Sequence, residues 1–319
     1  MTNFLHPTST AGLHETAAAS TQTTPAALLT GTKVAELSLP LKVFATSMRQ
    51  LDRLVPTLVT RLLLHHFLHA RRPASADYVR NLPGTAQPFT LRHHGRNLQG
   101  WCWRAHPAQT VNSPTVLLVH GWEDHSGAML PLVEPLLRSG FRVLTLDAPG
   151  HGLSPRMPTH LHDYGLALQQ LLQRENGVYA VVAHSWGAAA ISAMLARRPG
   201  LQPERMALVA PMQGLQEHLN IFAGIAGMCN ERLARLTARL QQGIDISMQQ
   251  LCAVHAASRL QATGLLVHDC GDPLIPYGNS SAIAARWSDA QLMTTRDLGH
   301  RRILDSPAVH ERIVRFLEQ

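Results

Sequence analysis

One serine in this sequence has the surroundings of a nucleophile. Ser185 is the central residue of the segment 183–187, which follows the apolar run Val178–Val182 and precedes a stretch of small residues. A strand, a tight turn and a helix with a serine at the apex hold the hydroxyl in a strained backbone conformation, so small residues must stand two positions before and after it. Ala183 and Gly187 meet that requirement. A serine hydroxyl also needs a histidine base and an acid that orients the base.

Candidates for the base and the acid follow Ser185 in the chain. Residues 264–269 are typical of a buried strand, and Asp272 lies in the turn-rich loop just beyond it. A helix over about 277–287 and a strand over 291–295 are expected next, and His300 follows that strand, ahead of a terminal helix over 307–317. His300 would take the serine proton and Asp272 would orient the imidazole. Asp269, at the end of the first of these strands, is the alternative acid.

Two segments upstream complete a familiar pattern. Residues 116–119 are typical of a strand and run into His120-Gly121-Trp122, and residues 143–146 run into the loop Asp-Ala-Pro-Gly-His-Gly-Leu-Ser over 147–154. With the serine turn and the chain order Ser, Asp, His, these segments resemble the α/β-hydrolase superfamily from about Gln87 to the C-terminus. The resemblance implies a mostly parallel central sheet with helices on both faces. A serine at the turn indicates the esterase- and lipase-like branch, since the haloalkane dehalogenase and epoxide hydrolase branches use an aspartate there.

The resemblance also implies how the rest of the site is built. The backbone N–H groups of Trp122 and Trp186 are expected to hold a tetrahedral oxyanion. A helical cap is expected over about 212–262, between the nucleophile and the acid, where it would exclude water and shape a pocket. His184, Met212 and Phe222 are the expected pocket residues, with core packing as the alternative role for Met212 and Phe222.

We expect three segments along the chain. Residues 1–36 are rich in Thr, Ala and Ser and are expected to be disordered. Residues 37–85 are expected to be an amphipathic helical segment, and residues 86–319 the catalytic domain. The catalytic domain should open with a hairpin of strands 89–92 and 98–103 around a turn at 94–97.

The region 41–72 permits two interpretations. Pro56 should begin a second helix there or kink a single one. Residues 36–80 carry seven Lys and Arg against three Asp and Glu, so a basic surface could contact an anionic membrane. Packing against the catalytic domain is favoured, because Pro56 interrupts the apolar stripe. That stripe recurs at helical spacing and consists of Met48, Leu51, Val55, Leu58, Leu62 and Leu63.

Composition excludes several classes of protein. The chain has 319 residues, 45% of them hydrophobic and 15% charged, which is typical of a soluble globular protein. It has no apolar run long enough to span a membrane and no secretory signal, and its four cysteines are scattered, so a cytoplasmic location is expected. The net charge of +7 comes without a nucleic-acid-binding motif. No cofactor and no metal are expected, because the spacing of His120, Asp124, His125 and His151 is a weak metal signature.

The expected reaction is hydrolysis of a carboxylic ester, or a related acyl bond, through an acyl-enzyme intermediate. Acyl transfer on the same triad is the alternative enzymatic reaction. A non-catalytic module that binds a ligand or partner is the alternative of another class. The expected partner is a small-molecule ester or acyl substrate, with Arg301 and Arg302 as candidates to bind an anionic part of it. The sequence does not predict the natural substrate or the oligomeric state.

Overall fold

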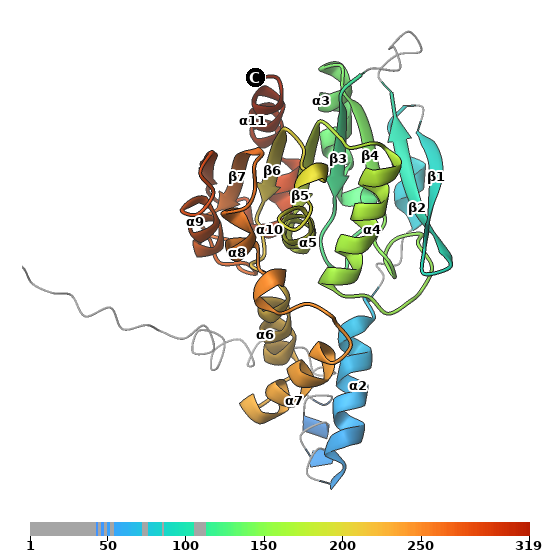
Figure 1. Ribbon diagram of the computed structural model, residues 1–319, viewed down its shortest axis with the longest axis vertical. Coiled ribbons are helices and arrows are strands. Elements are labelled where there is room, and N and C mark those ends of the chain that lie inside the picture. The colour runs from blue at the N-terminus through green and yellow to red at the C-terminus, as the bar shows by residue number, and fades with distance from the viewer. Residues whose placement is uncertain are drawn as a thin grey trace, which may run out of the picture.

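The computed structural model describes residues 43, 46–47, 50–51, 54–71, 76–84, 86–104 and 113–319. The segment 1–36, expected to be disordered, lies outside the described residues. Eight strands form one sheet in the order β1-β2-β4-β3-β5-β6-β7-β8 (Figure 1). β1 and β2 are antiparallel to their neighbours, and the other six strands are parallel. The strands are β1 Gln87–His93, β2 Arg96–Trp103, β3 Thr115–Val119, β4 Arg142–Leu146, β5 Ala180–His184, β6 Arg205–Val209, β7 Thr263–Asp269 and β8 Ala290–Thr295.

Helices cover both faces of the sheet because its central strands are apolar on both sides. Alternate residues of β3 enter different cores: Leu117 and Val119 pack with α4 (Leu161–Arg174) and α5 (Ser185–Leu195), whereas Val116 and Leu118 pack with the other core. That second core includes α3 (Val133–Arg138) and α11 (Pro307–Leu317). The mostly parallel sheet with helices on both faces confirms the predicted α/β architecture. Apart from α2 and the helices between β6 and β7, which are described next, the other helices are η3 Ala76–Asn81, η4 Ser126–Leu132, η5 Pro199–Leu201, α9 Gly278–Ala284, α10 Gly299–Arg302 and η7 Ile303–Asp305.

The hairpin that opens the sheet has a tighter turn than the sequence suggested. His93 pairs with Arg96, so the turn consists of His94 and Gly95 alone, not of residues 94–97. Both turn residues have positive φ, 45° and 74°, as the two-residue type I′ turn requires. The usual residue pairs of such a turn are Asn-Gly, Asp-Gly and Gly-Gly, so His-Gly was a weak signal for so short a loop.

The chain between β6 and β7 is helical, and its helices divide into two groups. α6 (Leu215–Ile225) and α7 (Asn230–Gln241) stand away from the sheet, and α7 contacts α2 (Pro56–Leu68) (Figure 1). η6 (Gln249–Leu251) and α8 (Ala253–Ala257) instead pack against α5. The part of this insertion that can cover a site is therefore α6 and α7.

α2 begins at Pro56, which confirms that this proline starts a helix. Its buried face consists of Val59, Leu63 and Phe67, spaced four residues apart. The stripe expected from sequence was only partly right: Leu63 is buried and Leu51 is partly buried against the core, but Val55, Leu58 and Leu62 are exposed. Met48 lies outside the described residues. The expected stripe failed because Val59 and Phe67 turn toward α6 and α7, which lie far away in the sequence. In the described part of the chain, none of the helices has the length and apolar character needed to cross a membrane.

Candidate active site

Ser185 stands at the sharp turn where β5 ends and α5 begins. Its φ is 53°, in the left-handed region that residues other than glycine rarely adopt. Gly187 allows this turn, because a Cβ there would lie 2.2 Å from the backbone oxygen of His120. Ala183 is fully buried at the end of β5. The turn presents the Ser185 hydroxyl at the carboxyl end of the sheet's central strand.

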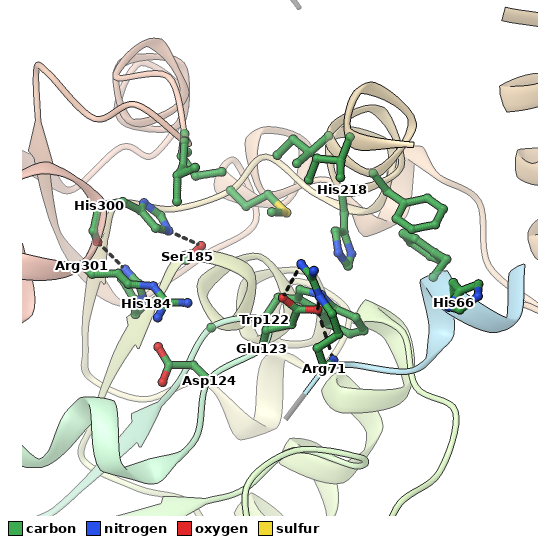
Figure 2. A pocket seen from close by; sticks show the side chains of 18 of the residues that line it. His66, Arg71, Trp122, Glu123, Asp124, His184, Ser185, His218, His300 and Arg301 are labelled. Carbon is green, nitrogen blue, oxygen red and sulfur yellow. Dashed lines mark hydrogen bonds and ion pairs between the residues drawn. The ribbon is translucent and has the colours of Figure 1, made fainter. Parts of the chain in front are cut away.

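Three side chains from three separate elements meet at this turn. The Ser185 Oγ lies 2.9 Å from Nε2 of His300 (Figure 2). Nδ1 of the same imidazole lies 2.7 Å from Oδ2 of Asp272. His300 belongs to α10, the short helix after β8, and Asp272 to the loop after β7. The structure thus brings together the three residues that the sequence analysis selected as nucleophile, base and acid.

The Asp272 carboxylate is held on both oxygens. Oδ1 accepts hydrogen bonds from the backbone N–H groups of Leu274 (2.8 Å) and Ile275 (2.9 Å), which leaves Oδ2 for His300. Burial by itself would raise the pKa of Asp272, but hydrogen bonds from His268 and His300 outweigh it and hold this pKa well below its usual range. Asp272 is therefore an ionised acceptor at neutral pH.

His268 is a further polar residue at the site, and the sequence analysis missed it. Its Nε2 lies 3.1 Å from the backbone oxygen of Ile275 and 3.4 Å from Oδ2 of Asp272, so it carries a proton. Nδ1 lies 2.7 Å from Oγ of Ser280, within hydrogen-bond distance. Ser280 is fully buried and lines no part of the cavity described below, so this pair supports Asp272 from behind. A histidine within the apolar strand β7 was the available signal.

The rival acid, Asp269, has other partners. Its Oδ1 accepts from the N–H of Gly271 (3.0 Å), and its Oδ2 accepts from Oγ1 of Thr295 (2.9 Å) and the N–H of Leu298 (3.0 Å). These bonds tie the loop after β7 to the end of β8 and to the segment before α10. Asp269 is thus a brace for the loops that carry Asp272 and His300.

A cavity of about 390 Å³ opens onto Ser185 and His300. The expected pocket residues His184, Met212 and Phe222 line it, as do Trp122 and Arg301. Arg302 does not line the cavity, and its Nη2 donates to the backbone oxygen of Asp297 instead. The wall opposite Ser185 comes from α2, the residue after it and α6 (Figure 2). Its residues were not predicted from the sequence and are His66, Phe67, His69, His218, Ile221 and Ile225.

The α2 wall is fastened to the turn after β3 by an ion pair. Arg71 donates to Oε1 of Glu123 through Nε (2.9 Å) and its backbone N–H (3.1 Å), and to Oε2 through Nη2 (3.2 Å). Glu123 has a φ of 53° and follows Trp122. This ion pair connects the segment before the hairpin directly to the rim of the cavity.

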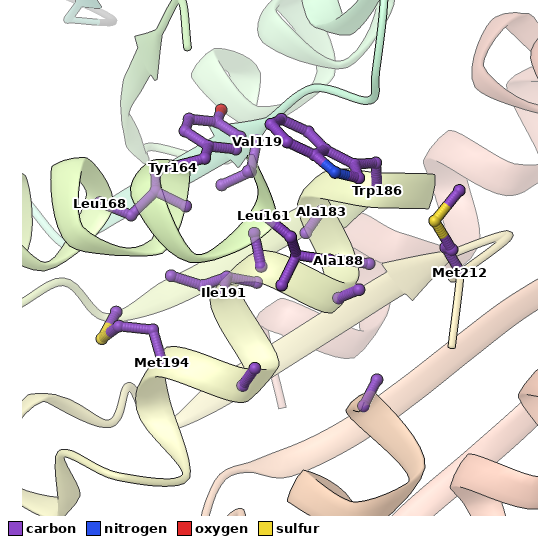
Figure 3. Close-up of a cluster of buried hydrophobic side chains, with 14 of the residues drawn as sticks. Val119, Leu161, Tyr164, Leu168, Ala183, Trp186, Ala188, Ile191, Met194 and Met212 are labelled. Carbon is purple, nitrogen blue, oxygen red and sulfur yellow. The ribbon is translucent and has the colours of Figure 1, made fainter. Parts of the chain in front are cut away.

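Trp122 and Trp186 occupy the positions expected to supply oxyanion donors. A Cβ on Gly121 would lie 3.3 Å from Cβ of Ser185, so the turn that carries Trp122 abuts the nucleophile. Trp186 is the second residue of α5, where a backbone N–H has no acceptor within the helix. Its indole is fully buried among apolar side chains of α4 and α5, stacked on Tyr164 with the ring centroids 5.2 Å apart (Figure 3).

His184 lies beside His300 and does not contact its ring nitrogens. Its Nε2 donates to the backbone oxygen of His300 (2.9 Å), and the two ring centroids are 4.8 Å apart. Burial lowers the pKa of His184 to about 3, so its ring is neutral. It forms a wall of the cavity and supports the backbone of α10.

The histidines near the β3 and β4 turns form hydrogen bonds within and between these two loops. His120 donates through Nδ1 to the oxygen of Gly121 (2.8 Å) and accepts at Nε2 from the N–H of Ala148 (3.0 Å). His151 donates through Nδ1 to the oxygen of Pro149 (2.9 Å). Asp124 and His125 do not join them in a metal-type cluster among the described residues.

Comparison with known proteins places this geometry in a family. The family model of the serine aminopeptidases, S33, matches residues 111–268, and that of the TAP-like proteins matches residues 243–319. A pimeloyl-[acyl-carrier protein] methyl ester esterase of Nitrosomonas europaea is 31% identical over 242 residues, which cover 63% of this chain and 94% of that protein. The esterases of the same name from Xylella fastidiosa are 46% identical over 52 residues, and the chain spans about a fifth of their length.

Solved structures share the fold at low identity. The esterase Pf2001 of Pyrococcus furiosus has a TM-score of 0.59 and 19% identity, and the match covers 78% of this chain and 98% of that one. Est1E of Butyrivibrio proteoclasticus, solved with ferulic acid bound, has a TM-score of 0.56 and 16% identity, with 72% and 96% covered. The fold, the serine turn and the long match to the Nitrosomonas protein agree: this chain belongs to the α/β-hydrolase superfamily, in its serine-hydrolase, esterase- and lipase-like branch.

Proposed function

We propose that this chain hydrolyses carboxylic esters through an acyl-enzyme formed on Ser185. The observation that carries the proposal is the continuous contact from Asp272 through His300 to Ser185 at the wall of a cavity that is mostly apolar. A hydroxyl 2.9 Å from an imidazole whose other nitrogen faces an ionised carboxylate is set up for deprotonation.

The reaction takes place in two steps. His300 Nε2 takes the proton of Ser185 Oγ as that oxygen bonds to the ester carbonyl carbon, and Asp272 stabilises the resulting imidazolium. The backbone N–H groups of Trp122 and Trp186 donate hydrogen bonds to the carbonyl oxygen as it becomes negatively charged, and the N-terminus of α5 adds a favourable dipole. The C–O bond to the alcohol then breaks, and His300 returns the proton to the leaving oxygen. Water, deprotonated by His300, attacks the acyl-enzyme in the same way and releases the acid.

The cavity favours an acyl group of modest size. Its volume of about 390 Å³ lies at the lower end of small-molecule sites, and Phe67, Met212, Ile221 and Phe222 give it an apolar wall. The Nitrosomonas relative is by name an esterase of a methyl ester on a carrier protein. We therefore propose esters of small to medium acyl chains as the substrate class, with Arg301 beside His300 as the cationic group that an anionic ester would meet.

Labelling with a fluorophosphonate, followed by peptide mass spectrometry, tests the proposal. We expect one adduct, on Ser185, and hydrolysis of p-nitrophenyl esters that the adduct abolishes. Ser185→Ala should lose labelling and about 10⁶-fold in kcat. Ser192→Ala is the matched control, because Ser192 lies in the same helix with a buried, unpartnered hydroxyl, and it should keep both. Absence of labelling in the folded protein would refute the enzymatic role and favour a binding module.

A further inference from the structure

Two imidazoles and a carboxylate converge on one point outside the active site. Nε2 of His93 and Nε2 of His94 each lie 2.9 Å from the same oxygen, Oδ1 of Asp163, and the three atoms all lie within 4.8 Å of one another. His93 and His94 come from the β1–β2 hairpin, and Asp163 from the first turn of α4. None of the three lines the cavity at Ser185. We propose that these residues bind a divalent transition-metal ion of the zinc type.

The donor set and its spacing fit such an ion. Imidazole nitrogen and carboxylate oxygen are ligands that Zn²⁺ accepts at about 2.0–2.2 Å. Ligand atoms at that bond length stand about 3.3 Å apart around a tetrahedral ion, from the same bond lengths. The two contacts of 2.9 Å need to open by a few tenths of an ångström, and the two imidazole nitrogens, which lie within 4.8 Å of each other, need to move closer together. The exposed His94 ring is the ligand that can move to do both. The ion would take the place of the protons that now lie between the nitrogens and Oδ1.

Neighbouring side chains already hold the ligands in place. Nδ1 of His93 lies 2.9 Å from Oε1 of Gln170, a bond that turns Nε2 toward Asp163. The second carboxylate oxygen, Oδ2, accepts from Oγ1 of Thr159 at 3.0 Å. Metal-binding histidines commonly donate their other ring N–H to such a partner, which fixes the ring's orientation. His93 and Asp163 are buried, whereas His94 is exposed and marks the side from which an ion would enter.

The position suggests a clamp, not a participant in the reaction. The ion would join the hairpin at the edge of the sheet to α4, which packs on α5 behind the nucleophile. Because an ion that binds only the folded state stabilises it, the melting temperature should rise with the ion's concentration while ester hydrolysis stays unchanged.

The test uses the full chain after chelator treatment, with Zn²⁺ followed by calorimetry and Co²⁺ by its visible absorption. His65 and His69, four residues apart at the C-terminal end of α2 with ring centroids at 4.0 Å, are a competing pair of metal ligands, so all arms carry His65→Gln. We expect one ion per chain, lost in His94→Gln, and an affinity about 10–100-fold lower in Gln170→Ala. His310→Gln, which removes a distant histidine, should bind normally.

Two outcomes would overturn the proposal. If the His65→Gln protein binds no ion, the three residues form a hydrogen-bonded cluster only. If binding persists undiminished in His94→Gln and in Asp163→Asn, the ion sits elsewhere. His94→Gln alters an exposed side chain, so this variant should remain folded even if Asp163→Asn does not. Circular dichroism of both variants distinguishes the loss of a metal ligand from the loss of folded structure.

Discussion

Replacing Asp272 with asparagine should disable the base without removing it. Oδ1 of Asp272 faces two backbone N–H groups, of Leu274 and Ile275, which can only donate, so the amide oxygen of Asp272→Asn must take that position. The amide nitrogen then takes the place of Oδ2, 2.7 Å from Nδ1 of His300. An NH₂ group there donates to Nδ1 and places the ring's single proton on Nε2. That proton faces Ser185, so the imidazole can no longer accept the hydroxyl proton.

The size of the effect follows from this change of tautomer. Amidation of the acid in a Ser-His-Asp triad costs about 10⁴-fold in kcat, which corresponds to about 5.5 kcal/mol of activation free energy. His268 increases the penalty, because its Nε2–H also points toward the position that the amide nitrogen would occupy. KM should change little, since Asp272 does not line the cavity.

The assay is hydrolysis of p-nitrophenyl butyrate, with Asp269→Asn as the matched control. Asp269→Asn leaves the His300–Asp272 contact in place but turns an amide N–H toward one of three donors, so it should cost about 1–3 kcal/mol of stability and less than about tenfold in kcat. A greater loss of kcat in Asp269→Asn than in Asp272→Asn, with both proteins folded, would show that the acid has been wrongly assigned.

Three further outcomes are expected. Gly187→Ala should lose about 3 kcal/mol of unfolding free energy, because its Cβ would meet the backbone oxygen of His120. Gly224→Ala is the control: its Cβ would lie in open space in α6, so the free energy of unfolding should stay the same or rise. Equal urea midpoints for the two variants would contradict this prediction. Phe67→Leu should make room in the cavity for about one more buried methylene of the acyl chain, so the ratio of kcat/KM for octanoyl over butanoyl esters should rise about fourfold. An unchanged ratio would show that Phe67 does not contact the acyl chain. Burial lowers the pKa of four histidines to about 3 and keeps their rings neutral in the folded state: His120, His151, His184 and His218. Because the unfolded chain takes up the proton that the fold excludes, the free energy of unfolding should fall between pH 6.5 and 3 by about 1.4 kcal/mol per pH unit for each of them. Urea titrations that give the same free energy of unfolding at pH 7 and pH 5 would refute this prediction.

Local patterns carried the prediction of the fold. The terminal helix begins and ends as expected, at Pro307 and Leu317, because a proline at its first turn and a regular apolar period mark it in the sequence. The turn at Ser185 was recognisable because small residues are required at fixed positions around it. These features depend on neighbours in the chain, and the order Ser, Asp, His then identified the superfamily.

Features that depend on distant contacts were not predictable in the same way. Phe67 of α2 and His218 of α6 are in contact in one wall of the cavity, with ring centroids 4.7 Å apart, although the sequence of neither helix predicts this contact. The buried face of α2 differs from its most obvious apolar stripe for the same reason. His268 looks like a core residue of β7 until the loop after it folds back and brings Asp272 within 3.4 Å. Sequence reasoning thus finds the residues of the proposed triad but not what surrounds them.

The ion pair between Arg71 and Glu123 has a practical consequence. It fastens a wall of the cavity, carried by the helix that precedes the hairpin, to the rim beside Ser185. Under the proposed function, part of the acyl wall therefore lies on a stretch of chain that is separate from the one carrying Ser185, Asp272 and His300. Deleting the chain through residue 71 would remove this part of the wall, including the buried Phe67, without removing Ser185, His300 or Asp272, and we expect the shortened protein to discriminate less among esters. Related chains could change their preferred substrates by exchanging this leading helix alone.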